Sequence, residues 1–430
     1  MKRVLIISYY WPPTGGSGVQ RWVKFSKYLQ DEGWQPVVYT PSNPEMITVD
    51  ESLAREIPDG VEVIKRRIFE PYEMYRRLSG KSGQSAQDGE VNPVNASHKS
   101  LGSRIAMFIR GNFFLPDPRC FWVGPSVRYL RHYLKEHPVD VMVSTGPPHS
   151  MHLIARRLSR RTGIPWVADF RDPWTKMFYF KHLHLTALSE WIHRRMEKKV
   201  LDGASVVVSV SPLVRDEFVQ MTSTPVELIT NGYDESDFGK ACPDGFFNIT
   251  HTGLFASDGD PVTLWKVLAD KAASDPEFAD RLRIRLAGKT DREIILSIRK
   301  AGLESNLVDL GYRTHAEAVQ EQRNASVLML PLRKEPEYRA VLPGKLFEYL
   351  AAGHPILGIG QSDGAMAAIV RDSDTGLTAE WEDYDTIRQF IDTQWDAFRS
   401  GVDPYRGKDV SRYSRRALTR RMAELFDSLT

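Results

Sequence analysis

The chain has 430 residues, of which 42% are hydrophobic and 26% charged, a composition typical of a soluble protein with room for two domains, each with its own core. Its net charge of +2 and the lack of interleaved basic and aromatic residues disfavour nucleic-acid binding, and no stretch is long and apolar enough to span a bilayer. The two cysteines, Cys120 and Cys242, have neither metal-ligand nor disulfide spacing, so we expect a reduced, cytoplasmic compartment.

The first 40 residues have the pattern of a strand, a loop, a helix and a second strand. Residues 3–9 (RVLIISY) form an apolar, β-branched run too short for a signal peptide, and a glycine-rich turn follows at 14–18. Apolar residues then recur at helical spacing over 19–29, and a further strand is predicted over 36–40. This order predicts a parallel sheet with helices on its faces.

The same alternation continues to about residue 212. Strands are predicted over 139–144, 166–169 and 205–210, with a helix over 150–161 and a longer one before the last strand. We therefore expect a first Rossmann-like domain over 1–212. Residues 79–103 are rich in Ser, Gly, Gln and Asn, which predicts a mobile insertion inside this domain.

A second series of strands and helices begins near Val226, and the boundary is placed at Ser211-Pro212. Six strands are predicted, over 226–229, 248–252, 283–287, 307–310, 327–330 and 356–359. We expect a second Rossmann-like domain over 213–395. The remaining residues, 396–430, contain a basic amphipathic helix at 411–429 that we expect to pack back across the junction onto the first domain.

Charge is distributed unevenly between the two halves. Residues 1–212 hold 30 Lys and Arg against 20 Asp and Glu, a net charge of +10, whereas the remainder holds 27 against 35, a net charge of −8. The basic half, with arginine pairs at 156–157, 160–161 and 194–195, suits an anionic membrane surface or an anionic acceptor. The mixed aromatic and arginine-rich segment 104–119 is either part of such a contact surface or a packed helix.

The most informative motif is PGKLFEYLAAGHP, residues 343–355. It predicts an apolar helix that carries Lys345 and Glu348 on one face near its start. A helix start favours an anion, and a carboxylate one turn later can accept two hydroxyl protons from a ribose. The motif therefore indicates a site for a nucleoside diphosphate, and the alternative is an exposed ion pair between the two side chains.

The glycines after the first strand allow close approach of the backbone to a ligand. A nicotinamide dinucleotide is disfavoured, because Arg21 stands where a third glycine would be needed and no acid closes the second strand. Two pairs of aspartates, Asp258 with Asp260 and Asp372 with Asp374, resemble metal ligands, but both fall in turns and we interpret them as turn residues. We therefore expect no metal ion and no cofactor.

Four stretches in a fixed order resemble the GT-B retaining glycosyltransferases of family 4. They are YYWPPTGGSGVQRWVKFSKYL, then STGPPHSMHL with PWVADFRDPW, then LITNGYDESDF, and finally LPGKLFEYLAAGHPILGIG. Together they extend over nearly the whole chain. The resemblance implies an α/β protein of two Rossmann-like parallel-sheet domains that face a central cleft, with an acceptor-side first domain and a second domain that binds a nucleotide-sugar.

The resemblance assigns the donor-binding residues. Lys345 would bind the diphosphate and Glu348 the ribose hydroxyls. The glycine loop would meet the phosphate end of the donor, the Asn231-Gly232 turn would lie at the mouth of the cleft, and the base would lie near a strand end at 311–313. The complete donor set is Gly15, Gly16, Gly18, Asn231, Lys289, Tyr312, Arg313, Lys345 and Glu348.

The chain departs from the family pattern at two places. Ala340 occupies the position of the first of two glutamates that many members place eight residues apart, and Leu254 and Phe255 stand where many members have a basic residue. The diphosphate must then depend on Lys345, with Lys289 or Arg313 as further candidates.

Four residues are predicted to converge on the carboxyl edge of the first sheet: His149, Asp169, Arg171 and Asp172. His149 would hold the sugar or pass a proton, with His152 as the competing choice, and Asp169 or Asp172 would orient the acceptor while Arg171 pairs with either carboxylate. Because no pair of carboxylates suited to double displacement is evident, charge placement around the leaving diphosphate would supply most of the catalysis.

The predicted function is transfer of a sugar, with retention, from a nucleotide-diphosphate donor to a glycan or lipid-linked acceptor in cell-surface polysaccharide synthesis. The protein would be cytoplasmic, either free or peripheral on the inner face of the plasma membrane. The alternatives are a nucleotide-sugar 2-epimerase of the same fold and a non-catalytic protein that binds nucleotides or glycans.

Overall fold

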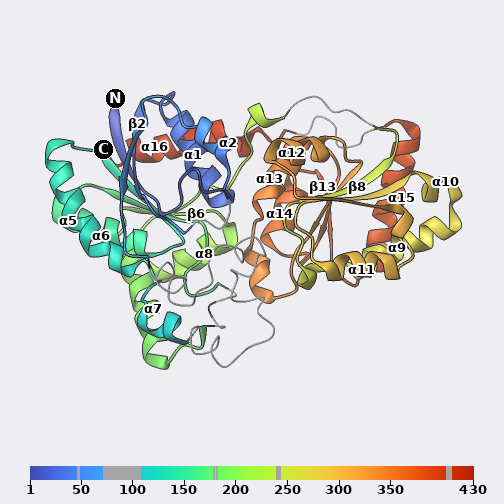
Figure 1. Cartoon of the computed structure of the whole chain (residues 1–430), viewed down its shortest axis with the longest axis horizontal. Helices are drawn as coiled ribbons and strands as arrows, with labels where there is room; N and C mark the ends of the chain where they lie inside the picture. The colour runs from blue at the N-terminus through green and yellow to red at the C-terminus, as the bar shows by residue number, and fades with distance from the viewer. Residues whose placement is uncertain (46–48, 71–107, 178–179, 181–182, 239–243, 403–408) are drawn as a thin grey trace. The chain divides into compact units, whose positions relative to one another are not determined.

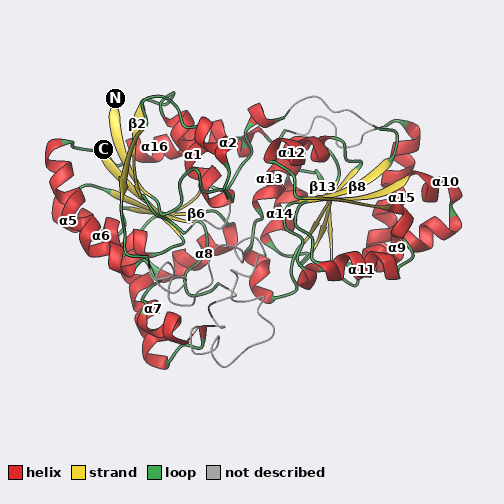
Figure 2. Cartoon of the chain, in the orientation of Figure 1, coloured by secondary structure: helices red, strands yellow, loops and turns green. Residues whose placement is uncertain are grey.

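The computed structural model describes all residues except 46–48, 71–107, 178–179, 181–182, 239–243 and 403–408. The chain divides into two compact units (Figure 1). Unit 1 comprises Met1–Thr230 and Leu418–Thr430, and unit 2 comprises Asn231–Ala417. Each unit is a parallel sheet with helices packed on it (Figure 2), which confirms the predicted α/β class. The predicted insertion at 79–103 lies outside the described residues.

Unit 1 contains a seven-stranded sheet in the order β3-β2-β1-β4-β5-β6-β7, and every strand pair is parallel. The strands are β1 (Lys2–Ile7), β2 (Trp34–Pro41), β3 (Glu62–Arg66), β4 (Val141–Gly146), β5 (Trp166–Phe170), β6 (Val206–Ser209) and β7 (Val226–Leu228). The helices are α1 (Ser17–Leu29), α2 (Glu51–Arg55), α5 (Cys120–Glu136), α6 (Ser150–Thr162), α7 (Ala187–Leu201) and α8 (Pro212–Met221). The strands β4, β5 and β6 are buried along their whole length, as expected of a parallel sheet covered on both faces.

The strand near Val226 belongs to the first sheet, not to the second series as predicted. β7 pairs with β6 through Val207 and Val226, and it forms the edge of the sheet. The predicted boundary at Ser211-Pro212 therefore lies inside unit 1, between β6 and α8. Strand patterning alone does not say which sheet a strand joins, because the pairing partner is fixed by backbone hydrogen bonds to a distant segment.

The last helix, α16 (Arg415–Asp427), packs on the core of unit 1. Its residues Leu418, Met422 and Phe426 recur at i, i+4 spacing and are buried in the same cluster as α1 and β2. The Phe426 ring meets the Trp34 indole edge to face, with ring centroids 5.2 Å apart. The end of the chain is thus part of the core that supports β1 and β2.

Unit 2 contains a six-stranded parallel sheet in the order β10-β9-β8-β11-β12-β13. The strands are β8 (Phe247–Thr252), β9 (Leu282–Ala287), β10 (Leu307–Gly311), β11 (Val327–Pro331), β12 (Ile356–Ile359) and β13 (Gly376–Ala379). The helices are α9 (Val262–Ser274), α10 (Pro276–Arg281), α11 (Arg292–Lys300), α12 (His315–Arg323), α13 (Gly344–Ala352), α14 (Ala365–Asp372) and α15 (Tyr384–Ser400). None of the helices in the described part of the chain combines the length and apolar character that a membrane span requires.

Candidate functional site

The carboxyl ends of β1, β4 and β5 lie next to one another in unit 1, so the loops that follow them share one edge of the sheet. β4 pairs with both neighbours, and the pairs Ile7 with Ser144 and Gly146 with Phe170 mark the ends of the ladders. This edge is where open α/β sheets bind ligands. The glycine loop, the segment 147–149 and the segment 171–172 all leave the sheet here.

The glycine loop begins helix α1 and packs against Arg171. Gly16 has φ +107°, and its carbonyl accepts hydrogen bonds from the amides of Val19 (3.0 Å) and Gln20 (3.2 Å). A Cβ on Gly18 would overlap Nη1 of Arg171, so any larger residue would displace the guanidinium from its present position. Gly15 lies half-buried just before them.

Arg171 connects the glycine loop to the loop after β4. Its amide and its Nε donate to the carbonyl of Gly146 at 3.0 and 3.3 Å, and its Nη2 donates to the carbonyl of Pro147. Burial lowers the pKa of the guanidinium, and the nearby charges of Asp172 and Asp169 oppose that shift. Arg171 therefore joins two loops of the edge through main-chain contacts.

Asp169 does not fit the predicted role of orienting an acceptor. Its fully buried carboxylate accepts from Arg21 Nε (3.2 Å) and Nη2 (2.9 Å), Trp22 Nε1 (2.7 Å) and Thr145 Oγ1 (2.9 Å). Burial opposes the charged carboxylate, but the Arg21 ion pair and these hydrogen bonds outweigh it and hold the pKa of Asp169 below its usual range. Arg21 also donates to the carbonyls of Ile229 and Thr230, at 2.9 and 2.7 Å. The ion pair between Arg21 and Asp169 thus connects α1, β5 and the end of β7.

Asp172, at the same edge of the sheet, can accept hydrogen bonds from a ligand. It is half-buried, and no described residue donates a hydrogen bond to it. Burial raises its pKa, an effect that the charge of Arg171 only partly offsets. Of the two aspartates predicted here, Asp172 is the one with free acceptor oxygens.

His149 lies directly before α6, and its ring is stacked on Trp174 with centroids 4.5 Å apart and planes 3° apart. The side chain is buried, yet neither ring nitrogen has a hydrogen-bond partner among the described residues. Burial, and then the positive field of His152, Arg171 and His193, lower the pKa of His149 well below its usual value. A buried, neutral imidazole with both nitrogens unpartnered is equipped to bind a ligand hydroxyl.

The competing residue, His152, has a structural role. Its Nδ1 lies 2.8 Å from Ser144 Oγ, which accepts a hydrogen bond of 2.8 Å from Trp166 Nε1. Its ring stacks on Phe170 at 4.4 Å, and burial lowers its pKa to about 3. His152 is therefore fixed inside unit 1 by its neighbours, and His149 remains the candidate.

Three loops meet at the carboxyl edge of the sheet in unit 2. The amide of Gly253, after β8, donates to Ala287 (2.8 Å), and the amide of Gly288, after β9, donates to Gly311 (2.8 Å). A Cβ on Gly288 would overlap the backbone of Gly253. This close packing forms a glycine-lined floor beside the start of α13.

Lys345 lies over this floor. Its Nζ is 2.9 Å from His251 Nε2 and 3.3 Å from the carbonyl of Leu254, and a Cβ on Gly253 would lie 3.4 Å from it. Burial lowers the pKa of Lys345 to about 8, although the charge of Glu348 opposes the shift. No ion pair joins Lys345 to Glu348, so the alternative of an exposed salt bridge is wrong.

Glu348 lies one turn further along α13 with one oxygen engaged. Its Oε2 accepts from Gln322 Nε2 (2.9 Å), which also donates to Thr252 Oγ1 (3.0 Å). The Oε1 atom is 4.0 Å from His315 Nδ1, and the side chain keeps 20% of its surface exposed. Gln322 thus orients the carboxylate and leaves one oxygen for a ligand, a role that sequence reasoning missed because Gln322 lies on another helix.

The other predicted donor residues lie at the same edge of unit 2 or near it. Lys289 follows β9 with its ammonium exposed and without a partner among the described residues. Tyr312 follows β10 with 76% of its surface exposed, and Arg313 Nη1 donates only to the Tyr312 carbonyl (3.2 Å). Asn231 begins unit 2, but it does not form the predicted turn with Gly232, whose φ is not positive.

Both aspartates of the first acidic pair, Asp258 and Asp260, contact protein groups. Asp258 pairs with Arg333 (2.9 Å), Asp260 accepts from Trp265 Nε1 (2.7 Å), and Asp374 lies in a turn with φ +49°. In the part of the chain that the structure describes, no three His, Cys, Asp or Glu side chains come together as a metal site would require.

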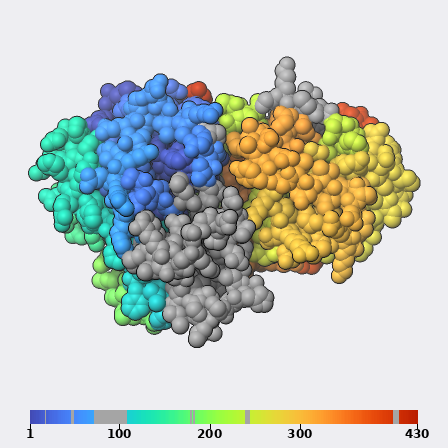
Figure 3. Space-filling view, viewed as in Figure 1, coloured from blue at the N-terminus to red at the C-terminus, as the bar shows by residue number. Residues whose placement is uncertain are grey.

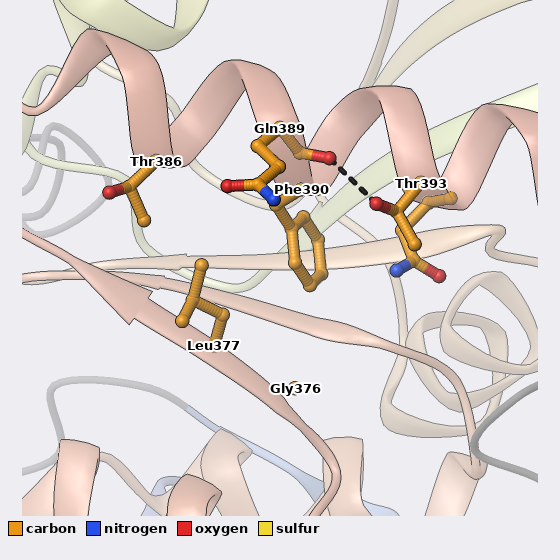
Figure 4. Close-up of a pocket in the computed structure, with 7 residues that line it drawn as sticks. Gly376, Leu377, Thr386, Gln389, Phe390 and Thr393 are labelled. Carbon is orange, nitrogen blue, oxygen red and sulfur yellow. Dashed lines mark hydrogen bonds between the residues drawn. The ribbon is translucent and has the colours of Figure 1, made fainter.

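A separate pocket of about 320 Å³ lies between β13 and α15 (Figure 4), lined by Gly376, Leu377, Thr386, Gln389, Phe390, Thr393 and Gln394. Gly376 begins β13, so the pocket lies toward the amino end of that strand. Lys345 and the glycine floor are at the opposite, carboxyl edge of the same sheet. The pocket is therefore outside the candidate site.

Two protein families match the chain. The family described as glycosyl transferase 4-like domain matches residues 16–232, and the family described as glycosyl transferases group 1 matches residues 264–393. The search of curated protein sequences found no match.

Solved structures resemble the chain over its full length. A glycosyltransferase from Rickettsia africae has 13% identity and a TM-score of 0.64, and the match covers 100% of this chain and 98% of that one. Sucrose-phosphate synthase from Thermosynechococcus elongatus has 14% identity and a TM-score of 0.65, with 100% and 99% covered. Alr3699/HepE from Anabaena, solved in complex with UDP-glucose, has 14% identity and a TM-score of 0.60, with 100% of each chain covered. At these identities the likeness concerns the fold, and it confirms the predicted GT-B architecture.

Proposed function

Because the chain belongs to the glycosyl transferase 4-like and group 1 glycosyltransferases, we propose that it transfers a sugar, with retention, from a nucleotide-diphosphate donor to a glycan or lipid-linked acceptor. The proposed setting is cell-surface polysaccharide synthesis. Neither a metal ion nor a cofactor is part of the proposal.

The observation that carries the proposal is the start of α13. The cationic Lys345 is half-buried there, and its Nζ contacts two uncharged partners, the His251 imidazole and the Leu254 carbonyl. A partly desolvated ammonium without a bonded anion is unfavourable, so the site gains free energy when a diphosphate binds. A charge-assisted hydrogen bond of this kind contributes about 1.5–3 kcal/mol. The free oxygen of Glu348, one turn away, suits ribose hydroxyls, and UDP-glucose in the Anabaena structure is a donor of the proposed class.

Each unit would supply part of the chemistry. In unit 2, Lys345 would stabilise the leaving diphosphate, with the exposed ammonium of Lys289 as a second cation. In unit 1, the unpartnered nitrogens of His149 would bind a sugar hydroxyl, and Asp172 would orient the acceptor. Since the oxygens of Asp169 already accept from protein donors, Asp169 and Asp172 do not form a carboxylate pair suited to double displacement. That supports attack on the same face as the leaving group.

Nucleotide binding and turnover test the proposal directly. UDP, GDP and dTDP, and then the sugar nucleotides of whichever base binds, are compared by thermal shift and by release of the nucleoside diphosphate. We expect Lys345→Met and Glu348→Gln to lose the shift, whereas Lys300→Met and Glu293→Gln, exposed positions on α11, keep it. If no nucleotide shifts the wild-type protein, the donor assignment fails. The anomeric configuration of the product, read by NMR, decides retention.

Two other functions predict different outcomes of the same assays. A nucleotide-sugar 2-epimerase would convert the donor to its epimer without an acceptor, whereas a transferase would hydrolyse it slowly at most. A non-catalytic binding protein would show the nucleotide shift but release no diphosphate with any acceptor pool. The missing first glutamate, at Ala340, is the feature that favours these alternatives.

An exposed apolar surface in unit 1 supports a lipid-linked acceptor at an anionic membrane. The helical residues 108–113 pack beside the start of α7, where the Thr186 amide donates to Asn112 Oδ1 (2.8 Å), and both segments reach the surface at one end of unit 1 (Figure 3). Phe113, Leu188 and Trp191 expose 71%, 66% and 56% of their surface there. We call these three residues the α7 surface. An apolar patch of this kind typically marks a contact site.

Arginines without a described acidic partner lie on α7 and on the neighbouring helix α6. Arg195 is placed over the Trp191 ring at 5.3 Å, and α6, which contacts α7, carries Arg157, Arg160 and Arg161, none of which has a described carboxylate partner. Burial, followed by repulsion from Arg160 and Arg157, lowers the pKa of the adjacent Arg156. Apolar side chains beside unneutralised arginines match the chemistry of anionic lipid.

Sedimentation with vesicles tests this surface. We expect the protein to bind vesicles that contain phosphatidylglycerol at low salt and not vesicles of phosphatidylcholine alone. The double variant Leu188→Ser/Trp191→Ser should lose binding, while Val219→Ser, an equally exposed apolar position on α8, should keep it. Equal binding by the double variant and the control would remove the α7 surface from the proposal.

A further inference from the structure

Trp174 forms one wall of the candidate site in unit 1; it ends the motif PWVADFRDPW, but sequence reasoning assigned it no role. The indole is 2% exposed and lies parallel to the His149 ring at 4.5 Å. Neither nitrogen of His149 has a hydrogen-bond partner among the described residues, so packing fixes the orientation of its ring. Because rotation about the last side-chain bond of histidine is broad, a flat neighbour is what selects a coplanar orientation.

Helix α7 in turn holds Trp174 through hydrogen bonds to its indole N–H and to its backbone. The Trp174 Nε1 donates to His193 Nδ1 at 3.1 Å, and the Trp174 amide donates to Glu197 Oε1 at 3.2 Å. The amide and hydroxyl of Thr175 also donate to Glu197, at 3.3 and 2.5 Å. His193 and Glu197 are four residues apart on α7, and both are buried on the same face of that helix.

The buried carboxyl group of Glu197 has a free-energy cost that an apolar residue of similar size would not have, which indicates that its hydrogen bonds have a specific role. Burial raises the pKa of this carboxyl group, and its donors, led by Thr175, oppose the shift. A carboxylate in the interior is unfavourable unless several donors surround it, and Glu197 has three, all from residues 174 and 175. The arrangement therefore fixes the backbone of Trp174 as well as its indole.

We propose that Trp174, held by His193 and Glu197, is a positioning residue that sets the orientation of the His149 ring for the sugar. This inference rests on the proposed function of His149. An aromatic pair of this kind biases orientation by a factor of about 2 to 13, and a misplaced contact group can lower turnover by about 100-fold. Loss of the Trp174 contact should change kcat more than the KM for the donor, because the proposed diphosphate contacts are in unit 2.

A double-mutant cycle with the full-length protein tests the proposal. Trp174→Leu removes the flat wall, Trp174→Phe keeps it but loses the donor to His193, and each is combined with His149→Ala. Trp34→Leu is the matched control, since it removes a buried indole from the core of unit 1 beside Phe426. Thermal unfolding is measured for all variants, so that lost folding is distinguished from lost orientation.

We expect Trp174→Leu to lower kcat by about 10-fold or more with less than a 3-fold change in KM, and Trp174→Phe to retain kcat within about 3-fold. In the His149→Ala background, Trp174→Leu should have no further effect on kcat. An equal loss in both backgrounds, or an equal loss in Trp34→Leu, would overturn the proposal.

NMR of protein labelled with ¹⁵N-histidine separates this inference from the proposed function. The ring signal of His149, assigned with the His149→Ala variant, should move in Trp174→Leu and stay in place in Trp34→Leu without any substrate. If His149→Ala alone keeps wild-type kcat while the ring signal still responds to Trp174→Leu, the role given to His149 fails but the positioning contact stands. An unchanged ring signal in Trp174→Leu would refute the contact.

Discussion

Raising the pH through 8 should weaken the capture of the donor, because it removes the charge from Lys345. Burial lowers the pKa of this ammonium from 10.5 to about 8, and the groups that face it are the His251 imidazole, the Leu254 carbonyl and, one turn away, Glu348. A lowered pKa means that the neutral form is favoured, so the cation is present below pH 8 and lost above it. A bound diphosphate favours the cation and therefore binds the protonated form.

The size of the effect follows from that value. With a pKa of about 8, roughly nine-tenths of the free protein carries the charge at pH 7 and roughly one-tenth at pH 9. The kcat/KM for the donor reports groups of the free enzyme, so it should fall about 10-fold between these two values of pH. An ordinary exposed lysine would leave it unchanged over the same range.

The assay is the release of nucleoside diphosphate at low donor concentration from pH 6.5 to 9.5. Lys345→Arg, which stays charged throughout, should have a lower but flat profile above pH 7.5, and Lys300→Met should follow the wild type. The Lys345→Arg profile also reveals any titration of the nucleotide itself. A wild-type kcat/KM that is constant from pH 7 to 9.5, or a fall that persists in Lys345→Arg, would refute the reasoning.

Three further predictions follow from the buried groups. Lys345→Met should raise the free energy of unfolding of the ligand-free protein at pH 7 by up to about 3 kcal/mol. The unfolded chain binds the Lys345 proton more tightly than the folded protein does, so the stability of the wild type should rise from pH 8 to 10.5. Equal denaturant midpoints for the variant and the wild type at pH 7 would contradict this prediction. Asp169→Asn should destabilise the protein by about 3–5 kcal/mol because it breaks the buried ion pair with Arg21. Asp172→Asn should instead lower kcat with little change in the unfolding midpoint. The reverse pattern would make Asp169 the functional carboxylate and Asp172 the structural one. Gly18→Ala should displace the Arg171 guanidinium and reduce activity more than Gly60→Ala reduces it, which kcat/KM and a crystal structure of the variant check.

Local sequence pattern was sufficient to predict the strands and helices that are largely buried. β1 and β8 were predicted because apolar, β-branched runs of that length have few other stable conformations in a domain of this size. The helix α13, with Lys345 and Glu348 on one face, was predicted for the same reason, since proline and glycine mark both of its ends. These features depend on residues within about ten positions of one another.

The partners of buried polar groups depended on the fold. Asp169 was expected to be catalytic, yet its carboxylate is satisfied by Arg21, which lies 148 positions earlier in the chain. His149 and His152 are three residues apart and similar in sequence context, but only His152 finds a hydrogen-bond partner. No local pattern distinguishes these cases, because the deciding donors come from other strands and helices.

The sequence by itself predicted most of the strands near the site and the helix α13, and it predicts an anion site at the start of that helix, because spacing, capping and charge along one segment underlie both predictions. Only the tertiary structure showed that β7 is the edge strand of the first sheet and that Lys345 contacts His251. The same holds for the stacking of Trp174, which α7 holds in place, on His149. The physical reason is that desolvation and hydrogen bonding depend on what surrounds a group in space, and those surroundings are assembled from residues far apart in the chain.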